Sequence, residues 1–193
     1  MVMKKLLFTL VMVFSAIFVQ AQNEHLKFKG IPIAGDLDTF VTALEQQGFY
    51  DINDSPVPNS ATLTGEFTNR DAVILVVANN NKKDVWKVAV MFDGTDKWDV
   101  LERDYQTYKD MFIEKYGKPK KVKEEFDDKT ASSYLQLYEL HQGRCTYASL
   151  FELKEGYIAI SIAPYGTLKG AILLEYEDEI NGNKSRKSAI DDI

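Results

Sequence analysis

The stretch from Met91 to Pro119, MFDGTDKWDVLERDYQTYKDMFIEKYGKP, restricts the fold most, because it holds a strand end, an amphipathic helix and a helix stop in that order. Thr95 or Asp96 is the expected N-cap. Gly117 followed by Pro119 is expected to end the helix, with Gly117 in a left-handed conformation. Between these ends the apolar residues follow at spacings of four, three and four, the period of a helix with one buried face: Leu101, Tyr105, Tyr108 and Phe112.

A shorter copy of this pattern lies earlier in the chain, in IAGDLDTFVTALEQQGFY from Ile33 to Tyr50. Asp36 is the expected N-cap and Gly48 the expected exit residue. The apolar positions again share one helical face: Leu37, Phe40, Val41 and Leu44.

Both helices are followed by runs of apolar, β-branched and aromatic residues that predict strands. The predicted strands span 62–67, 72–78 and 85–92 after the first helix, and 133–140, 147–153, 157–163 and 171–176 after the second. We interpret 23–33 as a lead-in or edge strand, 51–60 as a loop, 120–130 as a charged connector and 181–187 as a polar, mobile tail.

This order of elements predicts an α+β fold, an antiparallel sheet with two helices on one face. The chain would form it with two repeats, about 31–93 and 94–180, each a helix plus three or four strands. We expect Phe40, Leu44, Tyr105 and Phe112 to meet the inward residues of the central strands. In the strand 72–78, either Val73, Leu75 and Val77 or the alternates Ile74 and Val76 would point inward.

The first 21 residues have the composition of a signal peptide, with Lys4 and Lys5 before an apolar run and small residues at Val19 and Ala21. The sequence therefore predicts cleavage before Gln22, export to the periplasm or the exterior, and a single mature domain of residues 22–193. The apolar run is shorter than the roughly 20 residues that span a bilayer, so we expect no stable membrane span in the mature chain.

Charge and cysteine content exclude several classes of function. The formal charge of −6 becomes −8 when residues 1–21, with two lysines and no acid, are removed. An acidic chain opposes nucleic-acid binding, which depends on Lys and Arg. Cys145 is the only cysteine, so no intramolecular disulfide or thiolate metal site can form, and a small buried thiol is the expected state.

Four segments also carry a resemblance to a known group: FKGIPIAGDLDTFVTALEQQGF, TGEFTNRDAVILVV, EKYGKP and LEYEDEIN. They are similar to uncharacterised exported proteins of Gram-negative gut bacteria, and their arrangement resembles the tandem helix-plus-sheet repeat of the beta-lactamase inhibitor protein fold. The resemblance implies that fold and no functional residue. The disulfide-closed loops of the inhibitor have no counterpart in a chain with one cysteine, which speaks against an inhibitory role.

No motif in the chain points to a catalytic centre, a metal or a cofactor. GxSxG, HExxH, GxGxxG, CxxC and Walker patterns are absent. We expect His25, in a flexible N-terminus, and His141, in a hairpin turn, to be solvated. Asp51, Asn53 and Asp54 begin like a calcium loop but lack its Gly and distal Glu, which favours a turn.

The remaining feature is aromatic. If alternate residues of the predicted strands face away from the helices, Tyr134, Tyr138 and Tyr157 share an open sheet face, and tyrosine supplies contact area at low entropic cost. The sequence thus favours a non-enzymatic exported protein that binds a protein or glycan there, without a cofactor. Ordinary cross-strand packing of these tyrosines, a carboxylate-dependent hydrolase and a structural envelope component remain alternatives.

Overall fold

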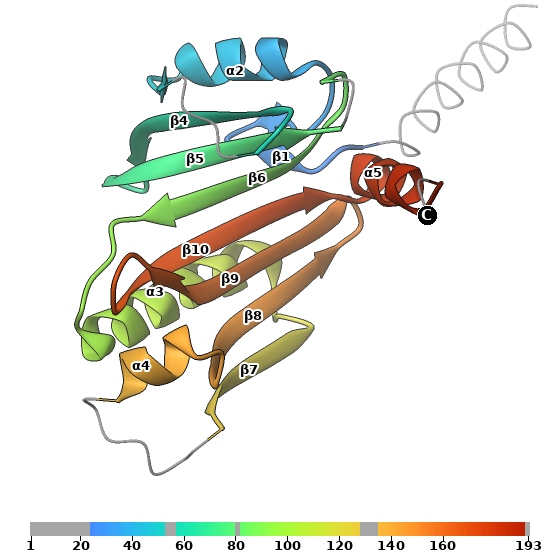
Figure 1. Ribbon diagram of the computed structural model, residues 1–193. Helices are drawn as coiled ribbons and strands as arrows, with labels where there is room; N and C mark the ends of the chain where they lie inside the picture. The colour runs from blue at the N-terminus through green and yellow to red at the C-terminus, as the bar shows by residue number, and fades with distance from the viewer. Residues whose placement is uncertain (1–23, 53–56, 80–81, 128–134, 192–193) are drawn as a thin grey trace, which may run out of the picture.

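The computed structural model describes residues 24–52, 57–79, 82–127 and 135–191 (Figure 1). Its centre is an eight-stranded sheet in which each strand pairs antiparallel with its neighbours. From edge to edge the strands are β3 (Tyr50–Asp51), β4 (Ser60–Phe67), β5 (Arg70–Ala78), β6 (Val85–Phe92), β10 (Lys169–Asp178), β9 (Gly156–Tyr165), β8 (Cys145–Leu153) and β7 (Lys121–Phe126). The expected α+β class with an antiparallel sheet is confirmed.

The first predicted helix is α2 (Leu37–Glu45), and its start is as expected. The Asp36 carboxylate accepts hydrogen bonds from the backbone N–H groups of Asp38 and Thr39, which satisfies two of the free donors of the first turn. Gly48 follows with φ of 90°, and the four predicted apolar residues of α2 are buried.

The second predicted helix is α3 (Trp98–Tyr116), whose N-cap is Lys97 and neither Thr95 nor Asp96. The Thr95 hydroxyl instead accepts from the Lys97 N–H, one residue before the helix. Gly117 ends the helix as predicted, at φ 83° and ψ −171°, so its φ is positive although its ψ is extended and not left-handed helical. All four predicted face residues are buried, together with Trp98.

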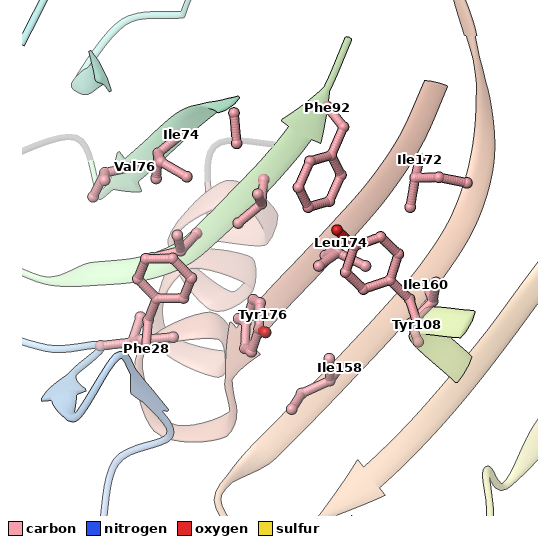
Figure 2. Close-up of a cluster of buried hydrophobic side chains, with 14 of the residues drawn as sticks. Phe28, Ile74, Val76, Phe92, Tyr108, Ile158, Ile160, Ile172, Leu174 and Tyr176 are labelled. Atoms are coloured by element: carbon pink, nitrogen blue, oxygen red, sulfur yellow. The ribbon is translucent and has the colours of Figure 1, made fainter. Parts of the chain in front are cut away.

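Both helices cover the same face of the sheet. The strand register places Ile74 opposite Val90, Val90 opposite Leu174 and Leu174 opposite Ile160, and all four side chains are buried. The Phe92 ring stacks on Tyr108 of α3 at 4.9 Å between centroids, and the α2 side packs on β4 and β5. Figure 2 shows this cluster, with Phe92, Leu174 and Ile160 beside Tyr108. Of the two registers that the sequence left open for β5, Ile74 and Val76 are therefore the inward residues.

A short hairpin, β1 (Lys27–Phe28) and β2 (Ile31–Pro32), occupies the predicted lead-in segment. Its turn has two positive φ angles, 49° at Lys29 and 83° at Gly30, as a two-residue primed turn requires. The hairpin puts Phe28 into the core, where its ring stacks on Phe67 at 5.4 Å and meets the edge of Tyr176 at 5.2 Å.

Four segments differ from the prediction. The segment predicted as a strand at 133–140 contains the helix α4 (Gln136–His141) in its described part, and the charged connector contains the edge strand β7. The predicted mobile tail is the helix α5 (Glu179–Asp191), and the predicted loop 51–60 begins with Asp51 of β3 and ends with Ser60 of β4. No helix in the described part of the chain is long and apolar enough to cross a membrane.

Candidate binding surface

The sheet face opposite α2 and α3 carries three straight rows of side chains, which we call the open face. The strand register aligns each row across six strands. The apolar row is Thr64, Val73, Met91, Leu173, Ser161 and Ala148; the middle row is Thr62, Leu75, Ala89, Glu175, Ala159 and Leu150; the charged row is Ser60, Val77, Lys87, Glu177, Tyr157 and Glu152. The face thus changes from apolar to charged over four residues along each strand.

The exposure of the apolar row is unusual for an inner part of a sheet. Val73 lies in the middle of β5 with strands on both sides, and 42% of it is exposed. Met91 and Leu173 are half-buried beside it, so water reaches a continuous apolar surface. Contiguous exposed apolar surface with a polar margin is typical of interaction sites.

Charges at the margin of the open face are largely paired. Lys87 forms an ion pair with Glu175 in the neighbouring row, and Lys120 pairs with Glu152. Lys121 and Lys123 of the edge strand β7 pair with Leu150 and Ala148, so they extend the middle and the apolar rows to a charged edge. Charged side chains on an edge strand also discourage pairing with another chain at that edge.

The three predicted binding tyrosines do not form one cluster. Tyr134 lies outside the described residues. Tyr138 lies in α4, where the Arg144 guanidinium is 5.5 Å from its ring centroid, and it is not part of the sheet face. Tyr157 alone is on the open face, in the charged row between Glu177 and Glu152. The residues around Tyr138 alternate as in a strand, but they form the helix α4.

Two other aromatic residues mark the borders of this face. Tyr50 of β3 is 69% exposed and pairs with Thr64, at the end of the apolar row. The Tyr165 ring lies over Gly94, where an added Cβ would come within 2.2 Å of its Cδ1. The ring can take this position because Gly94 has no side chain, and a Gly two residues after a predicted strand was the signal in the sequence.

The histidines and the cysteine differ partly from their predicted states. His25 is not free in solvent, because its Nδ1 lies 3.0 Å from an oxygen of the fully buried Asp178. His141 lies at the end of α4, with its Nε2 2.7 Å from the Lys169 carbonyl oxygen. Cys145 is buried as predicted, and burial raises the pKa of its thiol to about 12. Arg144, beside it in sequence, is instead engaged by both carboxylate oxygens of Glu139.

A polar network joins α3 to the sheet under the opposite face. Tyr105 is buried, and its hydroxyl oxygen lies 2.7 Å from the Ser149 hydroxyl oxygen. The Tyr105 hydroxyl also donates a hydrogen bond to the Glu124 carboxylate, which accepts another from Lys109. Burial by itself raises the pKa of Glu124, but the hydrogen bonds from Lys109 and Tyr105 outweigh it, so the pKa lies below its usual value. The network positions α3, and the described residues contain no group of three or more His, Cys, Asp or Glu side chains able to hold a metal ion.

The chain matches no family model, and neither a curated protein nor a solved structure is similar enough to count as a match.

Proposed function

We propose that this is an exported, non-enzymatic protein that binds a partner protein on the open face. The observation that carries the proposal is the apolar row, in which Val73, Met91 and Leu173 form a water-accessible surface on the side away from α2 and α3. An apolar centre beside charged residues such as Lys87 and Glu177 matches the usual division of protein interfaces into core and rim. Export rests on the signal-like composition of residues 1–21, with secretion to the periplasm or exterior.

A protein is favoured over a glycan as the partner because of the chemistry of the centre. The side chains there are aliphatic or small, whereas the aromatic residues Tyr50 and Tyr157 lie at the margins. Aliphatic side chains fill the fully desolvated core of a protein interface, and they offer a sugar ring few hydrogen-bonding groups.

We also propose that the chain is a tandem repeat of the kind found in the beta-lactamase inhibitor protein fold. The order of the sheet supports this, because α2 is followed by β3 to β6, α3 is followed by β7 to β10, and each half runs from its own edge to the centre. The last strands of the two halves, β6 and β10, then meet side by side, as a pseudo-twofold axis would require.

The proposed function is tested with a photo-crosslinking amino acid placed at Val73 in the protein expressed in its own organism. The matched control carries it at Asp110, an exposed position on α3. We expect a discrete crosslinked protein from position 73 and none from position 110, and Val73→Asp should abolish capture without changing the circular dichroism spectrum. Equal products from both positions, capture of a glycan, or no product from position 73 would contradict the proposal.

A further inference from the structure

A second candidate site lies on the helix-covered side of the sheet. A groove of about 500 Å³ is bounded by residues 24–30 of the N-terminal hairpin, by the last turn of α3 at Lys115 and Tyr116, and by the β8–β9 turn at Leu153 and Glu155. Sites for small molecules usually have volumes of about 300–1,000 Å³, so the groove is large enough for a ligand of moderate size.

The floor of this groove is aromatic. Phe28 and Tyr176, which are 1% and 4% exposed, meet edge to face at 5.2 Å, and Phe67 stacks on the other side of Phe28. Figure 2 shows Phe28 and Tyr176 as neighbours in the buried cluster. Above these two buried rings the accessible apolar lining consists of the half-buried Phe67, Tyr116 and Leu153, against which an apolar molecule would rest.

Two lysines of the lining, Lys29 and Lys115, hold their ammonium groups near aromatic rings. Lys29 Nζ lies 5.1 Å from the Phe49 ring centroid and 5.9 Å from that of Phe67, and Lys115 Nζ lies 5.0 Å from that of Tyr116. Ammonium groups over ring faces are stabilised by the ring quadrupole, which holds them beside apolar surface.

The other charged groups of the groove are mostly compensated. Lys27 forms an ion pair with Glu24 at 3.2 Å, and Nδ1 of His25 contacts the Asp178 carboxylate. The lining contains two acidic residues, Glu24 and Glu155. Among the described residues no carboxylate forms an ion pair with Lys29 or Lys115. Two uncompensated cations therefore remain beside an aromatic floor.

We propose that this groove binds an amphiphilic organic anion, with its apolar body against Phe67, Tyr116 and Leu153 and its acidic group at Lys115 or Lys29. Both lysines are exposed, so the acidic group can reach either ammonium group from the solvent side and form a charge-assisted hydrogen bond. This site is separate from the open face, since it lies on the opposite side of the sheet and shares no residue with the three rows.

The test uses protein of residues 22–193 and the anionic dye 8-anilinonaphthalene-1-sulfonate, whose fluorescence rises in apolar surroundings. We expect one dye per chain, displaced by dodecanoate at least about tenfold more effectively than by uncharged dodecanol, because one charge-assisted contact is worth roughly a factor of ten. Lys115→Gln or Lys29→Gln should weaken dye binding about five- to tenfold. Lys97→Gln, an exposed lysine outside both sites, should leave it unchanged.

Several outcomes would overturn this inference. Absence of dye binding would exclude the site, equal displacement by dodecanol would exclude recognition of the charge, and glutamine variants that behave like Lys97→Gln would exclude the groove. The open-face variant Val73→Asp should retain full dye binding, and loss of binding in that variant would place the dye on the open face. The groove and the proposed partner surface can therefore fail independently.

Discussion

Asp178 of β10 connects three parts of the chain: the N-terminal segment, the sheet and α5. Its side chain is fully buried at the end of β10, where one oxygen accepts from the Asn181 N–H of α5 and the other from the Leu26 N–H. Both oxygens lie within 3.1 Å of His25 Nδ1. A buried carboxylate is tolerated when its lone pairs are occupied in this way, so Asp178 ties the N-terminal segment and α5 to the sheet.

We expect Asp178→Asn to lower the free energy of unfolding by about 1–3 kcal/mol, the cost of a buried donor left without an acceptor. The asparagine oxygen can still accept from Asn181, but its amide group faces the Leu26 N–H, which is also a donor. Urea unfolding measures the change, with the exposed Asp110→Asn as the matched control. Equal midpoints for the two variants would mean that the Asp178 contacts contribute nothing net.

Glu124 makes the stability of the α3 interface depend on pH. Its folded pKa lies below the usual 4.5, because hydrogen bonds to the charged form outweigh burial. Ionised Glu124 therefore stabilises the fold above the unfolded pKa, and this contribution is lost as the pH falls through the folded value. We expect the stability difference between the wild type and Glu124→Gln to shrink from pH 6 to pH 3.

The control for this prediction is Glu125→Gln, on the same strand but exposed. Its stability difference from the wild type should change little over the same range. A Glu124→Gln difference that stays constant from pH 6 to pH 3 would show that the carboxylate is not coupled to folding.

At the scale of elements, helices and central strands could be predicted because their signals are periodic. The Leu101 to Phe112 spacing identified α3, and the apolar run around Ile74 identified the central strand β5. The edge strand β7 was missed because one side of its backbone is unpaired, so charges such as Lys121 and Lys123 are tolerated and hide the alternation.

Short or terminal elements were predicted poorly for a different reason. The six residues of α4 fit both the two-residue period of a strand and the period of a helix. The ion pair of Glu139 in α4 involves Arg144, which lies beyond the end of the helix. Helix α5 lacks an apolar face, and its start is set by the carboxylate of Asp178. Of the tyrosines predicted for the open face, Tyr157 lies on it and Tyr138 does not, because the segment around Tyr138 is helical. The apolar row was not predicted, because the alignment of Val73 with Met91 depends on the pairing of strands.

The end of α3 allows a direct test of element boundaries. Gly117 has φ of 83°, a value that a β-branched residue resists, and its N–H still closes the helix by donating to the Ile113 carbonyl. We expect Gly117→Val to lower the free energy of unfolding by about 1 kcal/mol or more. Lys118→Val, one residue later and exposed, is the control, and a neutral Gly117→Val would contradict a required positive φ.

At the scale of the whole molecule, stability is expected to come from the helix-covered face. Phe112 is 8% exposed and its ring meets Tyr116, Phe151 and Tyr176 within 6.2 Å between centroids. Phe112→Ala should therefore cost about 3–5 kcal/mol in thermal or urea unfolding. Met111→Ala, on the exposed side of the same helix, should stay within about 0.5 kcal/mol, and similar losses for both variants would contradict the burial of this helical face.

The two halves of the chain meet along the centre of the sheet, so neither should fold alone. β6 and β10 pair over Met91 to Lys87, and the Phe92–Tyr108 and Phe28–Tyr176 ring contacts also cross between the halves. Separation would leave a long apolar strand edge and an uncovered core on each half. We expect residues 22–93 and 94–193, expressed separately, to show no cooperative unfolding, and an equimolar mixture refolded together to recover it. Cooperative unfolding of either half alone would mean that its own helix and strands form a sufficient core, and that the central pairing joins two stable units and does not create one.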